Sequence, residues 1–194
     1  MTGVLDRVLR IGAVLIPVAL MLVVPFFVRG WRRKVASVAL GLAGLVTTIV
    51  IAYPGYRRWL DGVRVENVQV IFEVIEHYKA KTGRCPLERQ FTGEPMGVNI
   101  TPRPLPAYFQ KPPPGARGFI VPYQELLAEL RAGLGPIDLP VDPQKYAFGP
   151  PNFYQYQLAD GHFSVAASLW FDRPGTKQLG SHYYKYELSA SCRQ

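Results

Sequence analysis

The chain has 194 residues, of which 48% are hydrophobic, and it carries a formal net charge of +8 at pH 7. This length fits one domain with attached segments rather than two full domains. The basic residues are scattered and form no long run, which argues against nucleic-acid binding as the reason for the charge. The long aliphatic runs fall before residue 53, and the remainder is rich in Pro, Tyr and Gln. The composition therefore predicts a membrane-attached N-terminal part followed by a polar domain.

Two uncharged stretches, residues 11–28 and 35–53, are each close to the length that a helix needs to cross a bilayer. A cleavable signal peptide is the competing interpretation of the first stretch. That stretch contains Pro17 and Pro25 and leads into "VRGWRRK" rather than into a small-residue cleavage site. We therefore predict a transmembrane hairpin anchor over residues 1–53.

Four basic residues between the two stretches are predicted to lie in a tight turn that fixes the topology: Arg29, Arg32, Arg33 and Lys34. Because cytoplasmic loops carry an excess of Lys and Arg, this turn favours a cytoplasmic bend and an exported C-terminal domain. Other arginines flank the opposite ends of the stretches, so the count of basic residues alone leaves the orientation open. They are Arg7, Arg10, Arg57, Arg58 and Arg64.

The chain has two cysteines, Cys85 and Cys192, and neither belongs to a CxxC pair or lies near a cluster typical of zinc sites. In an exported domain an even pair of cysteines predicts a disulfide. Closing a loop of about 100 residues would stabilise the domain by about 4 to 5 kcal/mol on the chain-entropy model. Two unrelated buried thiols are the alternative interpretation.

Beyond Pro54 the apolar residues recur with a helical period, which predicts an amphipathic stalk helix over residues 54–84. Gly83 suits the position just after a helix, and Pro86 cannot continue one. We expect Pro54 to bend the helix without ending it, so that it continues the second membrane stretch. The expected apolar stripe comprises Trp59, Val63, Val70, Val74 and Tyr78, with Val68, Phe72 and Ile75 beside it, whereas Arg57, Arg58 and Arg64 are expected among the polar positions.

Residues 85–194 are predicted to form the globular part. A proline-rich tract up to residue 118 favours extended or turning chain, which crosses a surface or, alternatively, binds a proline-reading domain. "VPYQELLAELRAGLG" (121–135) predicts a short helix that starts at Pro122. Alternation from residue 153 onward predicts a three-stranded antiparallel meander packed on the amphipathic helix. The predicted fold class is α+β, with two N-terminal transmembrane helices, the second continuing as the stalk, and a small three-stranded sheet.

The inward-facing residues are predicted as a set. In the short helix they are Leu126, Leu127 and Leu130, and in the three strands they are Tyr154, Tyr156, Leu158, Phe163, Val165, Ala167, Leu169, Phe171, Tyr184, Tyr186 and Leu188.

A hydrophobic span that leads into an amphipathic helix, a loop and a small antiparallel sheet resembles a type IV pilin or a type II secretion major pseudopilin. "IAYPGYRRWLDGVRVE" (51–66) resembles the pilin stretch in which aromatics follow a proline by two and five residues, here Pro54, Tyr56 and Trp59. "YKAKTGRCP" (78–86) is similar to the segment that ends the first helix of major pseudopilins, with Cys85 in place of an aromatic. "YQYQLADGHFSVAASL" (154–169) resembles their first sheet hairpin.

The N-terminal region departs from the family pattern. Pilin-like proteins normally carry a short leader, cleaved after a glycine, before a span with glutamate at its fifth position; Ser37 stands there in this chain. An additional hydrophobic segment takes the place of the leader. The resemblance therefore implies a pilin-shaped domain that stays fixed in a bacterial inner membrane, with its C-terminal domain in the periplasm. Pro54, Tyr56 and Trp59 would set its exit from the bilayer.

Candidate catalytic and metal sites are weak in this sequence. Glu73 and His77 are spaced to share a helix face, where a solvated contact is expected rather than an acid–base pair. His162 and His182 could be neighbours in the sheet, but a metal site there would need a carboxylate that the sequence does not place. Major pseudopilins bind calcium in the loop after the sheet; the counterpart here, residues 168–181, offers Asp172 as its one carboxylate.

We therefore expect a non-enzymatic protein with no catalytic residue, no cofactor and no metal, whose role is interaction within an envelope assembly such as a pilus or secretion apparatus. Its expected partners are the membrane and other envelope proteins, with association between copies left open and no small-molecule substrate evident. The alternative function is a tethered periplasmic binding module or inhibitor. Such a module would recognise a soluble partner through the proline-rich loop and the aromatic sheet.

Overall fold

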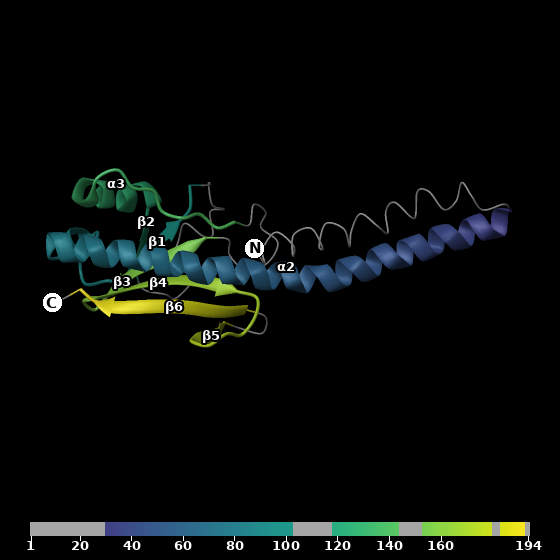
Figure 1. Ribbon diagram of the computed structural model, residues 1–194. Coiled ribbons are helices and arrows are strands. Elements are labelled where there is room, and N and C mark those ends of the chain that lie inside the picture. The colour runs from purple at the N-terminus through teal and green to yellow at the C-terminus, as the bar shows by residue number, and fades with distance from the viewer. Residues whose placement is uncertain (1–29, 103–117, 144–152, 180–182, 193–194) are drawn as a thin grey trace. The chain divides into compact units, whose positions relative to one another are not determined.

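The computed structural model describes residues 30–102, 118–143, 153–179 and 183–192 (Figure 1). The chain divides into two compact units, Met1–Arg58 and Trp59–Gln194, and helix α2 (Trp31–Thr82) contributes to both. The predicted first membrane span, residues 11–28, lies outside the described residues, as does Arg29. The other elements all belong to the second unit: the 3-10 helix η1 (Glu88–Gln90), β1 (Met96–Ile100), β2 (Phe119–Val121), α3 (Tyr123–Leu134), β3 (Tyr154–Ala159), β4 (His162–Leu169), β5 (Thr176–Leu179) and β6 (Tyr183–Ser191).

Helix α2 begins earlier than the sequence predicts. Trp31 is its first residue, so Trp31, Arg32, Arg33 and Lys34 are helical and the prediction of a turn over residues 29–34 is wrong at these four positions. Gly30 precedes the helix with a φ of 98°, a left-handed conformation that suits glycine. Because Arg and Lys are good helix formers, nothing after Gly30 delays the start of the helix.

The helix then continues through Pro54 and ends at Thr82. Gly83, with a φ of 76°, donates its N–H to the Lys79 carbonyl at 2.8 Å, which is the helix end that the sequence predicts. The stretch Val35–Thr82 contains a window long and apolar enough to cross a membrane, and none of that window is buried inside the protein. By length and composition, therefore, this one described helix can serve as a membrane span.

The buried stripe of α2 in the second unit agrees with the predicted one in part: Val68, Ile75 and Tyr78 are buried, as expected. Trp59 and Val70, both assigned to the stripe, are 48% and 46% exposed. The residues that are buried are Leu60, Asp61, Arg64, Val68, Ile71, Ile75 and Tyr78. Because a helical period fits neighbouring angular registers, the predicted stripe overlaps the buried one near the end of α2 and departs from it at Trp59 and Val70. The actual stripe includes two charged residues whose partners lie far away in the sequence.

The sheet has six strands in the order β2-β1-β3-β4-β6-β5, rather than the three predicted. β1 and β2 are parallel, and every other neighbouring pair is antiparallel. The predicted meander is present as β3, β4 and β6, with Tyr156 opposite Val165 and Val165 opposite Leu188. The additional strands are short, and β5 lies in a segment that the sequence predicts as a connector.

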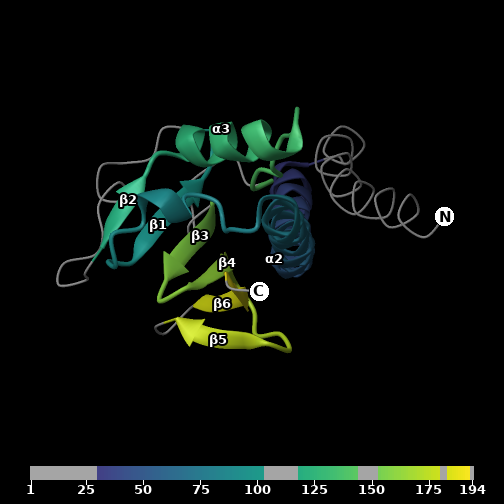
Figure 2. The ribbon, with the colours of Figure 1, turned by 90° about the vertical axis from the view of Figure 1, so that its left-hand side faces the viewer.

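Helices α2 and α3 lie on the same side of the sheet, which gives the second unit two layers around one core (Figure 2). Leu126, Leu127 and Leu130 of α3 are buried, as predicted. The predicted inward residues within β3 and β4 are all buried, and Tyr184, Tyr186 and Leu188 of β6 are partly buried against the same core. Phe171 was assigned to this face but lies beyond the end of β4 and is half-buried.

Candidate functional site: the contacts that fasten helix α2 to the sheet

An arginine and an aspartate form an ion pair in the interior of the second unit. Arg64, on α2, has no exposed surface, and Asp142, in the segment after α3, is 5% exposed. Arg64 Nε and Nη2 donate to the two Asp142 carboxylate oxygens at 2.6 and 3.2 Å. Arg64 Nη1 donates to the Ser168 carbonyl of β4 at 3.1 Å. One guanidinium thus joins the helix to the sheet and to the loop that follows α3, in the bidentate geometry favoured by arginine.

One turn earlier on α2, the buried carboxylate of Asp61 holds the chain that follows β4. It accepts the Trp170 N–H at 3.0 Å and the Phe171 N–H at 3.0 Å. Burial raises the pKa of the Asp61 carboxyl, and these two N–H groups together with the charges of Arg64 and Arg173 oppose that shift. Asp61 therefore caps the exposed end of β4 with a side chain from the helix.

The loop between β4 and β5 falls within residues 168–181, the segment compared above with the pseudopilin calcium loop. In its described part, the Thr176 hydroxyl donates to Asp172 Oδ1 at 2.7 Å and accepts the Arg173 N–H at 3.1 Å. Gly175 lies in the same turn and has a φ of 83°. Together with Asp61, these side chains supply the contacts that hold this turn in place.

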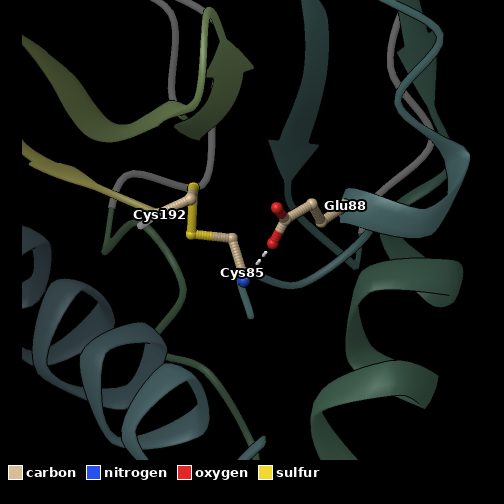
Figure 3. Close-up of side chains that lie close together, drawn as sticks. All are labelled: Cys85, Glu88 and Cys192. Carbon is tan, nitrogen blue, oxygen red and sulfur yellow. Dashed lines mark hydrogen bonds between the residues drawn. A yellow bond between two sulfur atoms is a disulfide. The ribbon is translucent and has the colours of Figure 1, made fainter. Parts of the chain in front are cut away.

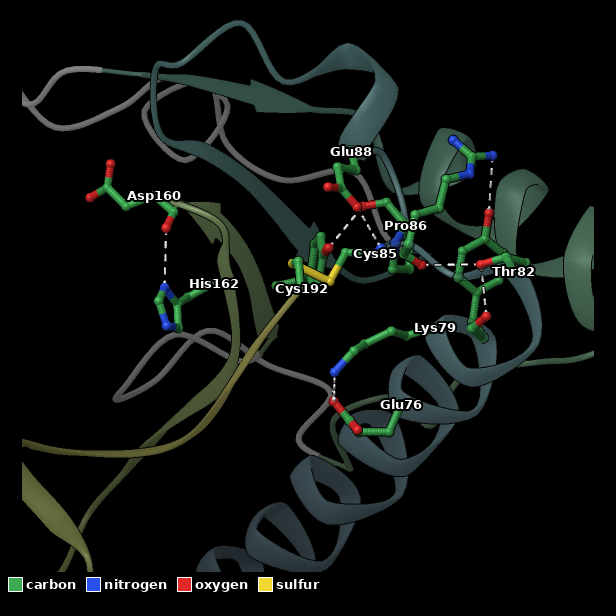
Figure 4. The surroundings of a disulfide bond; sticks show 12 residues. Glu76, Lys79, Thr82, Cys85, Pro86, Glu88, Asp160, His162 and Cys192 are labelled. Atoms are coloured by element: carbon green, nitrogen blue, oxygen red, sulfur yellow. Dashed lines mark hydrogen bonds and ion pairs between the residues drawn. A yellow bond between two sulfur atoms is a disulfide. The ribbon is translucent and has the colours of Figure 1, made fainter. Parts of the chain in front are cut away.

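A disulfide between Cys85 and Cys192, the pair that the sequence predicts, joins the segment after α2 to the end of β6. The Cys85 N–H donates to Glu88 Oε2 at 2.8 Å (Figure 3). The Cys192 N–H donates to the Gly161 carbonyl at 2.8 Å, and the Tyr156 hydroxyl donates to the Pro86 carbonyl at 2.8 Å. Both partners of the disulfide are thus held by hydrogen bonds as well. Figure 4 shows the surroundings of the disulfide.

The same group was tested as a metal centre, because the sulfurs of Cys85 and Cys192 and a Glu88 carboxylate oxygen lie within 4.8 Å of one another. Cysteine binds metals as the thiolate. In this structure the two sulfurs are bonded to each other, so neither is a thiolate. The donor set present here does not fit a metal ion, and the cluster is a covalent cross-link.

A single carboxylate on α3, that of Glu129, gathers the end of α2 and the segment after it. It accepts the Tyr78 hydroxyl and the Leu87 N–H, each at 2.8 Å, and pairs with Arg84 at 3.2 Å. Leu87 has a φ of 64°, a left-handed conformation that is uncommon for a large side chain. The Glu129 bond and the burial of the Leu87 side chain hold this turn next to Cys85.

The remaining predicted site residues do not converge. Glu73 and His77 are exposed on α2, and the structure shows no ion pair between these two described residues. His162 is exposed, with Nδ1 3.1 Å from the Asp160 carbonyl, whereas His182 lies outside the described residues. The candidate histidine pair therefore stays untested.

Pro54, Tyr56 and Trp59, which are predicted to set the exit from the bilayer, are exposed on α2; their role stays a prediction. Arg32, Arg33 and Lys34 are in its first turns, as described above. The central part of the proline-rich tract, residues 103–117, lies outside the described residues, so its role as a ligand or a surface crossing stays a prediction.

Sequence reasoning missed the charged members of the site, Asp61, Arg64 and Asp142. A signal was available for two of them. Asp61 and Arg64 occupy positions of a regular apolar stripe that includes Leu60 and Val68, and a charge at a core position calls for a buried partner. No local pattern marks Asp142 as that partner, because it is 78 residues away.

No family model matches this sequence, and the comparisons with curated proteins and with solved structures also found no match.

Proposed function

We propose that this protein is a membrane-anchored, pilin-like component or accessory of a bacterial envelope assembly, either a pilus or a secretion apparatus, and that its role is not catalytic. The observation that carries the proposal is helix α2. One part of it is long and apolar enough to cross a membrane, and another part is built into an α+β domain. A helix with both properties suits an assembly whose subunits associate through membrane spans and present folded domains.

The use of the buried charges supports a non-catalytic role. Asp61, Arg64 and Asp142 have 0%, 0% and 5% of their surfaces exposed, and each bonds to another part of the fold. Acid–base residues would instead be expected to face a cleft that a substrate can enter. These groups determine how the helix is fixed to the sheet, which is a structural task.

The cross-link between Cys85 and Cys192 supports a periplasmic location for the second unit. Disulfides form and persist in oxidising compartments such as the bacterial periplasm and are rare in the cytosol. The basic cluster Arg32, Arg33 and Lys34 at the start of α2 agrees with this orientation, because cytoplasmic ends of spans are enriched in Lys and Arg.

The experiment that tests the proposal separates anchoring from association. Residues 35–53 are replaced by an equally long polyleucine span, which still inserts but changes every side chain available for helix contacts. If α2 acts within an assembly, cells carrying this variant lose piliation or protein secretion although the protein remains in the membrane with its disulfide formed. A conservative control with only Leu40→Ile and Leu42→Ile should keep full function.

Full function of the polyleucine variant would contradict the proposal. The span would then be a simple tether, and the alternative, a periplasmic binding module that acts through its second unit alone, would account for the protein.

A further inference from the structure

We infer that residues 53–58 of α2 bind the headgroups of anionic phospholipids at the level where this helix leaves the membrane. The inference uses residues of the first unit alone. It does not depend on the role proposed for the whole protein in an assembly, because a tether would leave the bilayer at the same place.

The first step is the abrupt change in composition. Residues 35–53 contain no charged side chain, and Arg57 and Arg58 follow within five residues. Tyr53 and Tyr56, at the same level, are 45% and 46% exposed. Tyrosine is enriched at membrane–water interfaces because its ring is apolar and its hydroxyl is polar. The boundary between hydrocarbon and water is therefore expected at this turn and a half of helix.

The second step is the position of the Arg57 guanidinium. Its central carbon lies 4.0 Å from the centroid of the Tyr53 ring, one helical turn earlier. Arg57 Nη2 also donates to the Tyr53 hydroxyl at 2.7 Å. The ring and the hydroxyl together hold the guanidinium beside the helix at the height of the interfacial tyrosine. A positioned guanidinium loses less freedom when it binds, and its planar fork matches the oxygens of a phosphate.

The length of residues 53–58 matches the thickness of a headgroup layer. Six helical residues, from Tyr53 to Arg58, span about 7.5 Å along the axis. The polar headgroup layer on each side of a bilayer is roughly 5–7.5 Å thick, which is half the difference between the total and the hydrocarbon thickness. Two tyrosines and two arginines are therefore confined to one headgroup layer when the uncharged run fills the hydrocarbon core.

The positive charges of Arg57 and Arg58 favour a lipid whose headgroup carries a net negative charge. A zwitterionic headgroup carries its own cation beside the phosphate, whereas an anionic headgroup brings a net negative charge to Arg57 and Arg58. A basic residue at an anionic membrane surface strengthens binding by about fivefold. The surface is thus expected to select anionic lipids from a mixed membrane.

The test uses Trp59, the residue that follows Arg58, as a reporter of the surrounding lipid. The chain has three tryptophans, and Trp31→Phe with Trp170→Phe leaves Trp59 alone in the full-length protein. Trp31 has to be removed because it adjoins another basic segment. The protein is reconstituted into vesicles in which either phosphatidylglycerol or phosphatidylethanolamine carries brominated acyl chains, which quench a neighbouring tryptophan. The ratio of the two quenching efficiencies gives the relative occupancy of the two lipids.

We expect phosphatidylglycerol to be preferred by at least about fivefold, the contribution of one arginine, and Arg57→Gln with Arg58→Gln to reduce the ratio to about one. The charge-preserving pair Arg57→Lys and Arg58→Lys should retain a preference, and Arg89→Gln, which removes an exposed arginine elsewhere, should leave the ratio unchanged. A non-reducing gel that shows the disulfide intact verifies that each variant is folded.

Three results would overturn the inference. They are equal quenching by the two lipids, a preference that survives the double glutamine substitution, and the absence of quenching by either lipid, which would place Trp59 away from the bilayer.

Discussion

At the scale of single residues, the buried guanidinium of Arg64 is the most consequential side chain of the second unit. Asp142 is 5% exposed in the wild type, and Arg64→Ala removes the cation that its carboxylate contacts at 2.6 Å. Removing one partner of a buried ion pair typically destabilises a protein by about 3–5 kcal/mol. We expect a loss of that size in chemical denaturation of the full-length protein in detergent. Arg89→Ala, at an exposed position, should change the stability by less than about 0.5 kcal/mol.

A double variant distinguishes the stability lost with the ion-pair contact itself from the cost of leaving one buried charge without its partner. Arg64→Met combined with Asp142→Leu removes both charges and should recover most of the stability, because apolar pairs of similar volume often replace buried ion pairs without loss. A double variant no more stable than Arg64→Ala would contradict this reasoning. It would indicate that the bond from Arg64 to the Ser168 carbonyl carries most of the effect.

Two buried tyrosines predict how stability depends on alkaline pH. Burial raises the pKa of Tyr154, against the opposing hydrogen bond from Asn67, and burial together with the charges of Glu129 and Glu88 raises the pKa of Tyr156. In the unfolded chain both hydroxyls lose their protons near pH 10, whereas in the folded protein they keep them. The unfolded state then binds fewer protons, so this contribution to stability is complete below pH 10 and is lost as the pH rises above it.

We expect the free energy of unfolding to fall above pH 10 by about 1.4 kcal/mol per pH unit for each of these tyrosines. Tyr154→Phe with Tyr156→Phe should flatten this slope, although the variant is less stable at pH 7 because the Pro86 carbonyl loses its donor. Denaturation series at several pH values measure both effects. The exposed Tyr53→Phe is the matched control, and a slope that the double variant leaves unchanged would refute the assignment.

At the scale of elements, the contact between α2 and α3 depends on a glycine. A Cβ atom on Gly133 would lie 2.4 Å from Tyr78 Cε2, closer than non-bonded carbons can approach. Gly133→Ala must therefore push α3 away from the Tyr78 ring, at an expected cost of about 1–3 kcal/mol in stability. Denaturation of the full-length protein, followed by near-ultraviolet circular dichroism, measures this change.

Gly62 provides a control, because alanine is expected to raise the stability of the protein there rather than lower it. It lies inside α2, where an added Cβ would meet Arg173 at an ordinary contact distance of 3.8 Å. Alanine is a better helix former than glycine by up to about 1 kcal/mol, so Gly62→Ala should stabilise the protein. If both substitutions changed the stability equally, helix propensity rather than the contact with Tyr78 would be responsible.

The elements differ in how well the sequence predicts them. The C-terminal ends of α2 and α3 follow from local chemistry, since Gly83 and Gly135 both have positive φ values at the positions where each helix stops. β3 and β4 follow from alternation, because one face of each is buried throughout, and on the other face Ala166 is the one buried residue of these two strands. The sequence of β5 shows no such alternation, because its residues are mostly exposed at the edge of the sheet. Its strand conformation comes from pairing with β6.

The face of α2 that packs on the sheet was predicted only in part, and the reason differs from that for β5. Hydrophobicity alone favours a stripe through Trp59 and Val70, but both are exposed, and the buried stripe contains Asp61 and Arg64. Those charges are buried because backbone N–H groups of residues 170 and 171 and the carboxylate of Asp142 satisfy them. Partners more than 70 residues away decide which helix face is buried, and local periodicity contains no information about them.

At the scale of the whole molecule, chain connectivity through the disulfide complements these polar contacts. Cys85 directly follows the end of α2, and Cys192 follows β6, with a separation of 107 residues. The loop between them encloses every strand of the sheet and α3. A cross-link at these positions therefore restricts the unfolded state of almost the entire globular part, and the chain-entropy model assigns long loops the larger stabilisation.

We accordingly expect Cys85→Ala with Cys192→Ala to lower the free energy of unfolding by about 4–5 kcal/mol. The reduced wild type supplies the matched comparison, since reduction opens the same loop without a substitution. It should unfold at nearly the same denaturant concentration as the double variant, and both should unfold well below the oxidised protein. Hydrogen exchange locates the effect: because Cys192 follows the last residue of β6 and its N–H donates to the Gly161 carbonyl, the amides of β6 next to Cys192 should lose protection first. Coincident denaturation of the oxidised and reduced wild type would show instead that Asp61, Arg64 and Glu129 hold the fold together without the cross-link.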